Sequence, residues 1–223
     1  MKASRCIRIL CCFLCLAAPG AALSRGSAQV CPSSMVRVLA DDPMDAASAC
    51  EGARDAIRFF ESHSFKLPGM VAIEIRDSLP REAGPSAAGC FLEQDNQVLL
   101  VPYSALRGSR TWFNVTVDRT LYRSLAAHEV AHALAACNFA APNPSIQAKE
   151  YVAYVAMFAT MEPALRERVL KANQEPAFDN AERLTALLYM FDPMRFGVQA
   201  YRHFLGAGPQ FLEAVFAGKA LAD

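Results

Sequence analysis

The chain has 223 residues, 53% of them hydrophobic, and its 22 basic side chains balance its 22 acidic ones. Residues 1–28 contain four of the basic side chains and none of the acidic ones, so the remainder has 18 basic (22 − 4) and 22 acidic side chains, a net charge of −4. A negative net charge argues against a nucleic-acid partner and against electrostatic binding to membranes. After the N-terminal segment, no stretch reaches the roughly 18 uninterrupted apolar residues of a membrane helix.

The N-terminal segment has the pattern of a secretory signal. Basic residues from Lys2 to Arg8 precede an apolar run over residues 9–18, which is short for a membrane span. Pro19-Gly20 and several small residues follow. We therefore expect a signal peptide over residues 1–28, cleaved between Ala22 and Ala28, and a secreted or periplasmic protein. An uncleaved N-terminal anchor is the alternative.

Four of the eight cysteines lie after this segment: Cys31, Cys50, Cys90 and Cys137. An even number in an exported chain favours two disulfides, and three pairings are possible. The preferred pairing is Cys31–Cys50 with Cys90–Cys137, because the second bond would tie the sheet to the helix that follows it. Buried free thiols remain an alternative, and the absence of a C-x-x-C spacing disfavours a four-cysteine metal site.

Residues 29–117 are rich in predicted strands. Alternating apolar residues indicate strands, and apolar residues at helical spacing after Asp42-Pro43 indicate one long helix. The predicted strands are 35–39, 71–75, 89–93 and 97–101, with a short strand or loop over 112–117, and the predicted helix is 46–62. The strands 89–93 and 97–101 flank Gln94-Asp95-Asn96 and predict a β-hairpin. Residues 78–89 form a loop rich in Pro, Gly and Ala.

Residues 118–223 are predicted to be helical. Asp118 or Thr120 could cap a helix that ends near Cys137, and Pro-containing residues 139–145 form a loop. Later helices are expected at 146–160, 162–173, 179–190, 196–205 and 209–217. Strands in the first half and helices in the second predict an α+β fold, in one domain over residues 29–223.

The helix over residues 121–137 contains His128-Glu129-Val130-Ala131-His132, an H-E-x-x-H motif. Two His four residues apart lie about 40° apart around a helix axis, so both imidazoles can reach one metal ion. Glu129 is turned about 100° from His128 and can flank the metal without binding it. The helix is apolar on both sides, and burying these three side chains there is costly unless something such as a metal compensates them. This pattern predicts a zinc site with Glu129 as general base.

A catalytic zinc needs a third protein ligand as well as an open position for water. Glu150 is the best candidate, because an antiparallel pair of helices joined by the 139–145 loop would return it to His132. Glu162, at the start of the next helix, and His203 are rivals. A surface position beside Lys149 is the alternative for Glu150.

These residues resemble the gluzincin group of zinc metallopeptidases, in which two His of H-E-x-x-H and a Glu on a later helix hold zinc. The resemblance covers residues 118–160 and implies a zincin-like fold, with a small sheet and hairpin packed on the active-site helix. It also implies that His128, His132 and Glu150 are zinc ligands, that Glu129 is the base and that the substrate is a peptide or protein. The third His of the metzincins is absent after His132, and Tyr151 and Tyr154 stand near Glu150 where larger gluzincin families often have Asn or an acidic residue.

The sequence leaves two further roles open. A strand at the sheet edge before the motif helix could pair with an extended peptide substrate, although it could also be an ordinary strand. An oxyanion would need a donor besides zinc, for which Tyr154, Tyr201 and His203 are candidates.

Two other classes of protein remain possible. The first is a non-catalytic, zinc-stabilised binding or inhibitor domain that keeps the motif for structure. The second is a metal-free exported α+β domain in which the motif occurs by chance.

Overall fold

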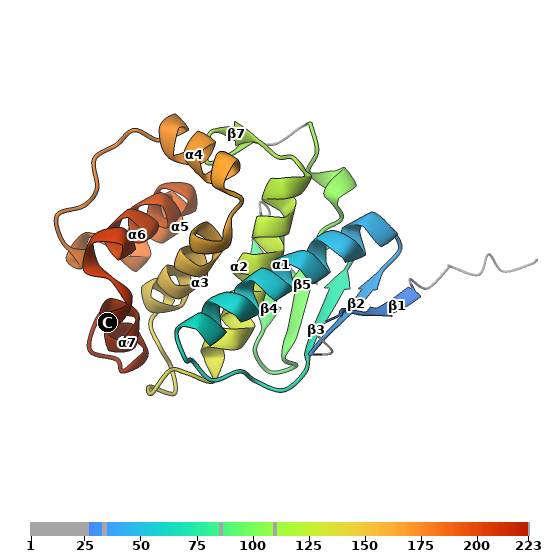
Figure 1. Ribbon diagram of the computed structural model, residues 1–223, viewed down its shortest axis with the longest axis horizontal. Coiled ribbons are helices and arrows are strands. Elements are labelled where there is room, and N and C mark those ends of the chain that lie inside the picture. The colour runs from blue at the N-terminus through green and yellow to red at the C-terminus, as the bar shows by residue number, and fades with distance from the viewer. Residues whose placement is uncertain (1–26, 33–34, 85–86, 109–110, 223) are drawn as a thin grey trace, which may run out of the picture.

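A five-stranded sheet forms one side of the molecule (Figure 1). The computed structural model describes residues 27–32, 35–84, 87–108 and 111–222. The strands are β1 (Ser27–Val30), β2 (Val36–Ala40), β3 (Val71–Ile75), β4 (Gly89–Leu92) and β5 (Gln97–Leu100), in the order β1-β2-β3-β5-β4. β2, β3 and β5 are parallel, whereas β1 and β4 run antiparallel to their neighbours. The predicted β4–β5 hairpin is therefore confirmed, and β4 lies at an edge of the sheet.

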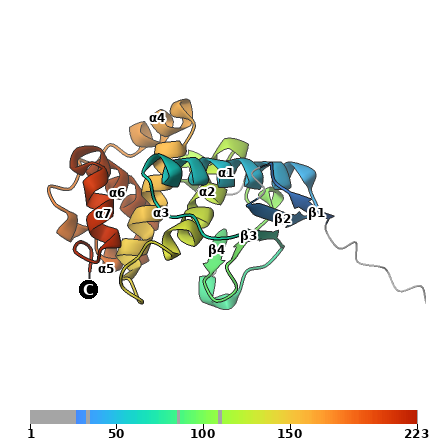
Figure 2. The same ribbon diagram turned by 60° about the horizontal axis from the view of Figure 1, so that its bottom comes forward.

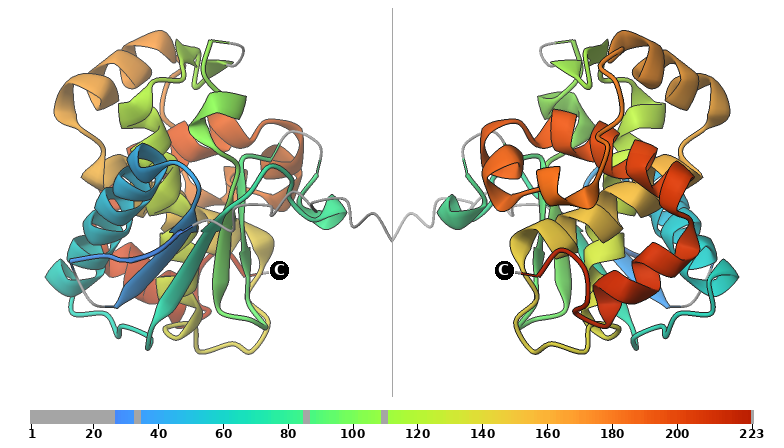
Figure 3. Two further views of the ribbon diagram at one scale, coloured as in Figure 1. Left: turned by 90° about the vertical axis from the view of Figure 1, so that its right-hand side faces the viewer. Right: turned by 90° about the vertical axis from the view of Figure 1, so that its left-hand side faces the viewer.

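The described helices are α1 (Pro43–Ser62), α2 (Arg119–Ala136), α3 (Ile146–Thr160), α4 (Pro163–Ala172), α5 (Ala186–Phe191), α6 (Pro193–Ala207) and α7 (Pro209–Phe216). α1 and α2 pack against one face of the sheet, α3 packs beside α2, and α5 to α7 lie beyond α3 (Figures 2 and 3). A small hairpin of β6 (Thr111–Trp112) and β7 (Val115–Thr116) precedes α2. The α+β class is thus confirmed. None of the described helices is long and apolar enough to cross a membrane.

Polar caps fix where the two helices of the predicted site begin. The Asp118 side chain accepts a hydrogen bond from the Leu121 backbone at the start of α2, and Ser145 accepts one from Ala148 at the start of α3. Each cap satisfies a backbone N–H that has no partner within the helix. The predicted cap at Asp118 and the predicted bounds of α3 are confirmed.

Two parts of the predicted layout differ from the structure. The helix expected over 179–190 begins only at Ala186, because residues 181–183 form a 3₁₀ turn and the Thr185 side chain then caps α5. β1 was not predicted, since its first two residues fall within the expected signal segment. The rest of that segment, residues 1–26, lies outside the described residues.

One of the two expected disulfides is present. Cys31 and Cys50 are bonded and tie the β1–β2 connection to α1, as predicted. The predicted Cys90–Cys137 bond is wrong, because both of these cysteines are free thiols. Gly89, next to Cys90, packs on Glu129, whereas Cys137, the residue directly after α2, lies eight residues beyond Glu129, about 12 Å at 1.5 Å per residue. The Cys90 side chain also points to the opposite face of β4 from Gly89, because strand side chains alternate.

Ion pairs hold α2 against α1. Arg119 pairs with Asp45, which is only 2% exposed, and the Arg123 guanidinium contacts Asp55 at 2.6 Å. A buried carboxylate of this kind requires a charged partner, so these pairs fix how α2 lies on α1.

Gly52 allows the close approach of α1 to α2, and this contact gives a stability prediction. A Cβ at Gly52 would lie 2.3 Å from the Arg123 carbonyl oxygen and 2.8 Å from the Ala126 Cβ. Since a backbone atom cannot yield cheaply, Gly52→Ala should lower the free energy of unfolding by ~3 kcal/mol, or the melting temperature by ~6–12 °C. Gly69→Ala is the matched control, because nothing lies within 4 Å of its Cβ position. Equal melting temperatures for the two variants, measured by circular dichroism, would contradict this packing.

Candidate metal centre

His128 and His132 lie one turn apart on the buried helix α2. Their Nε2 atoms are 3.2 Å from each other, and their rings are nearly perpendicular, at 89°. His128 is buried at 7% exposure and His132 is half-buried, and both line the same cavity. The helix therefore aims two nitrogen donors at one point.

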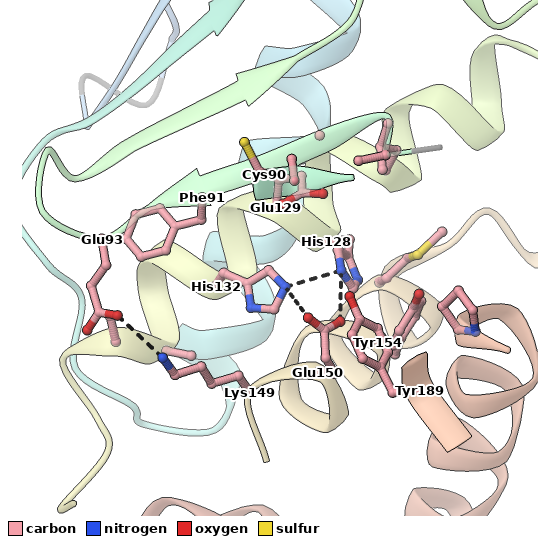
Figure 4. A pocket seen from close by; sticks show the side chains of 18 of the residues that line it. Cys90, Phe91, Glu93, His128, Glu129, His132, Lys149, Glu150, Tyr154 and Tyr189 are labelled. Atoms are coloured by element: carbon pink, nitrogen blue, oxygen red, sulfur yellow. Dashed lines mark hydrogen bonds and ion pairs between the residues drawn. The ribbon is translucent and has the colours of Figure 1, made fainter. Parts of the chain in front are cut away.

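Glu150 completes a triangle with the two imidazoles (Figure 4). Its Oε2 lies 3.5 Å from His128 Nε2, and its Oε1 lies 3.5 Å from His132 Nε2. Two ligands bound at 2.0–2.2 Å on a tetrahedral ion are ~3.3–3.6 Å apart. The two separations of 3.5 Å lie within this range and that of 3.2 Å lies just below it, so the three donors suit one shared cation. The α2–loop–α3 arrangement brings Glu150 back to His132, as the sequence led us to expect.

The chemistry of the three donors also fits a cation. Burial lowers the pKa of His132 to about 4, so its imidazole is neutral and has a free electron pair at neutral pH. Burial opposes ionisation of Glu150, but the two imidazoles and the Tyr189 hydroxyl together hold its pKa below its usual range. For His128, burial lowers the pKa, but Glu150 and Glu129 outweigh this effect and raise it. The site thus concentrates negative charge where a cation would neutralise it.

Glu129 faces the edge strand rather than the Glu150 carboxylate. A Cβ at Gly89 would lie 2.6 Å from the Glu129 Cγ and 2.7 Å from its Oε1, so only glycine leaves room for this side chain. Burial raises the pKa of Glu129 to about 7, with Glu150 adding to the effect and His128 opposing it. A carboxylate with this pKa can both accept and return a proton near neutral pH.

Two phenols adjoin the cluster, and one of them was not predicted. Tyr154, on α3, is buried with its ring centroid 4.4 Å from that of His128, and Gly197 on α6 leaves space for the ring. Tyr189, on α5, lies on the opposite side of Glu150 from His132, and its hydroxyl helps to lower the pKa of that carboxylate (Figure 4). Burial raises the pKa of both phenols, so both keep the proton that a donor needs. No motif marks Tyr189, which reaches the site only because α5 folds back over α3.

Other candidate residues lie elsewhere. His203 hydrogen-bonds the Tyr151 hydroxyl at 2.9 Å through Nδ1, and Tyr201 stacks on Phe158. Neither borders the main cavity. Glu162 caps α4 by accepting hydrogen bonds from the Ala164 and Leu165 backbone. The structure thus brings His128, Glu129, His132, Glu150 and Tyr154 together and leaves His203 outside.

A cavity of about 910 Å³ gives solvent and ligands access to the cluster. β4 and the loop before it form one wall, α2 and α3 form the floor, and residues around α5 form the other wall (Figure 4). Its apolar lining includes Phe91, Trp112, Leu125, Met157 and Met194. Pockets of this size, mostly apolar with a few convergent polar groups, are typical of ligand-binding sites.

Fold and site together define an α+β protein with a buried cluster of two His and one Glu that could hold a metal ion. The chain belongs to a family of unknown function, DUF6639, whose model matches residues 36–223. This range includes all of the candidate site and every described element except β1. Neither the curated proteins nor the solved structures gave a significant match.

Proposed function

We propose that this protein is an exported, zinc-dependent metallopeptidase of zincin-like type. The observation that carries the proposal is the triangle of His128, His132 and Glu150, with separations of 3.2 and 3.5 Å, beside a buried Glu129 with a raised pKa. Two His and one Glu are a donor set that suits catalytic zinc. The disulfide supports an oxidising compartment, secreted or periplasmic.

The roles of the chain's residues in hydrolysis follow from their positions. When bound, zinc would polarise the substrate carbonyl and make its water more acidic. Glu129 accepts a proton from the attacking water as the water oxygen forms the new C–O bond. Glu129 then returns this proton to the leaving amine as the C–N bond breaks. One water is consumed, and a carboxyl and an amine are released. Tyr154, whose ring lies beside that of His128, and Tyr189 both line the cavity, so these phenols are the candidate donors to the developing oxyanion.

The edge strand supports a peptide as the substrate. The Val101 N–H donates to the Ala88 carbonyl, and β4 and β5 pair with Cys90 opposite Leu99. Because hydrogen-bonded and outward residues alternate in an antiparallel pair, the backbone groups of Gly89 and Phe91 point away from β5. Both residues line the cavity, so an extended peptide could pair with them directly beside Glu129.

Metal analysis combined with a hydrolysis assay tests the proposal. Protein purified from a secretory host should contain about one zinc per chain and cleave unfolded casein. Removing the metal with 1,10-phenanthroline should abolish cleavage, and adding zinc back should restore it. A protein that binds zinc without cleaving any peptide would favour the alternative of a zinc-stabilised binding or inhibitor domain. Failure to bind zinc at all would contradict both.

A further inference from the structure

An ion pair crosses the cleft at one end. Glu93, directly after β4, and Lys149, directly before Glu150 on α3, both line the cavity, and their Oε2 and Nζ atoms are 3.4 Å apart. Figure 4 shows the pair on the His132 side of the cluster, with Tyr189 on the opposite side. Their side chains are 60% and 37% exposed, so the charges are open to solvent. The pair therefore bounds the cleft at a place that a ligand can reach.

Glu93 continues the row of β4 residues that faces the cleft. Side chains alternate along a strand, so Gly89 and Phe91 share the face towards α2 and α3, and Glu93, the first residue of the turn after β4, lines the same cavity. Gly89 adjoins Glu129, and Glu93 lies four residues further on, about 13 Å at ~3.3 Å per residue. A peptide paired with β4 therefore has room for about three or four residues between the reacting bond and the ion pair.

The direction of the peptide decides which terminus meets the ion pair. Antiparallel pairing is slightly more stable per residue than parallel pairing, and β4 already pairs antiparallel on its other edge. A peptide antiparallel to β4 runs with its N-terminus towards Glu93. The charged residues of the cavity lining also favour a cationic terminus, because the described lining contains four Glu and, among Lys and Arg, only Lys149.

We propose that Glu93 binds the free N-terminal ammonium of the substrate, which would make this protein a peptidase that removes short peptides from N-termini. This inference rests on the proposed function and specifies its substrate class. The terminal ammonium shares the Glu93 carboxylate with Lys149 or takes its place. An exposed ion pair is worth little on its own, so the exchange is easy. A substrate with a blocked N-terminus brings no positive charge to Glu93. A substrate with more residues before the reacting bond would have to pass between Glu93 and Lys149. Both kinds of substrate should therefore bind less well.

Peptides with free and N-acetylated termini test the inference. We would incubate the zinc-loaded protein with a tryptic digest of casein, one half of it acetylated, and identify the products by mass spectrometry. Free peptides should be cut within their first four bonds, with kcat/KM about tenfold higher than for their acetylated copies. Glu93→Gln should reduce this preference to below about threefold, mainly through KM. Asp95→Asn is the matched control, because it removes the same charge from the same turn but does not line the cavity.

The possible contrary results separate this inference from the proposed function. Internal cleavage that ignores acetylation would overturn the role of Glu93 and leave the metallopeptidase intact. Cleavage near C-termini that is lost on C-terminal amidation would also overturn it, since the carboxylate would then be bound at Lys149. If the zinc-loaded protein cleaves none of the peptides, the proposed function fails, and this inference fails with it.

Discussion

Glu129→Gln should lower kcat by ~10²–10⁴-fold while the protein still binds zinc. The amide keeps the size and shape of the carboxylate beside Gly89 but cannot accept a proton from water. Glu129 does not belong to the His128, His132 and Glu150 triangle, so the three metal donors remain in place. Hydrolysis of casein peptides and zinc content per chain, measured on the same preparation, check both halves of this result.

Glu82→Gln is the control for this substitution. Glu82 lies on the exposed 3₁₀ turn η1 (Arg81–Ala83) and lines the same cavity. The substitution therefore removes a nearby carboxylate without changing any residue of the cluster. This variant should keep its activity. If Glu129→Gln hydrolyses peptides at the wild-type rate, Glu129 is not the base. If it loses zinc together with activity, its role is to hold the site rather than to transfer the proton.

The local chemistry of the site was predictable because it depends on one helix and its neighbour. Spacing of four residues fixes His128 and His132 on one face, whatever the rest of the chain does. Glu150 was predictable because the Pro-containing loop at 139–145 is too short to let α3 leave α2. α3 lies where the sequence placed it, since Ser145 caps its first turn and residues 151–159 form an uninterrupted apolar run.

The parts that were not predictable depend on tertiary contacts. Tyr189 reaches Glu150 from a six-residue helix whose start is set by Thr185, and nothing in its local sequence indicates this approach. The pairing of Cys90 with Cys137 failed because it required the strand to present Cys90 to α2, whereas Gly89 occupies that side. His203 looked plausible only as a late residue that could fold back, and it hydrogen-bonds Tyr151 instead.

Gly89 links the sheet to the chemistry in a way that sequence alone does not reveal. In the sequence it looks like the end of a loop rich in Gly and Ala. In the structure its missing side chain leaves space for Glu129, while its backbone faces the cleft. The strand that would hold the substrate therefore also limits where the Glu129 side chain can lie. The positions of the substrate and of the base thus depend on the same residue.

Glu150→Ala should weaken zinc binding by more than ~100-fold, because loss of even an outer-shell partner of a metal ligand costs about 10–100-fold. The two imidazoles would remain, but a catalytic zinc needs three protein ligands. At the same free zinc concentration, the increase in the free energy of unfolding caused by zinc should be roughly 2.7 kcal/mol smaller for this variant than for the wild-type protein. Competition with a chromogenic zinc chelator measures the affinity, and melting curves with and without zinc measure the stabilisation.

Glu162→Ala is the matched control. The sequence offered Glu162 as the other candidate for the third metal ligand, but its carboxylate caps α4. Loss of the cap should lower the melting temperature slightly, equally with and without zinc, and leave zinc affinity unchanged. Opposite results for the two variants, with zinc retained by Glu150→Ala and lost by Glu162→Ala, would mean that α3 does not supply the third ligand. Since the 3.5 Å contacts place both Glu150 oxygens against the imidazoles, we expect the metal to depend on α3.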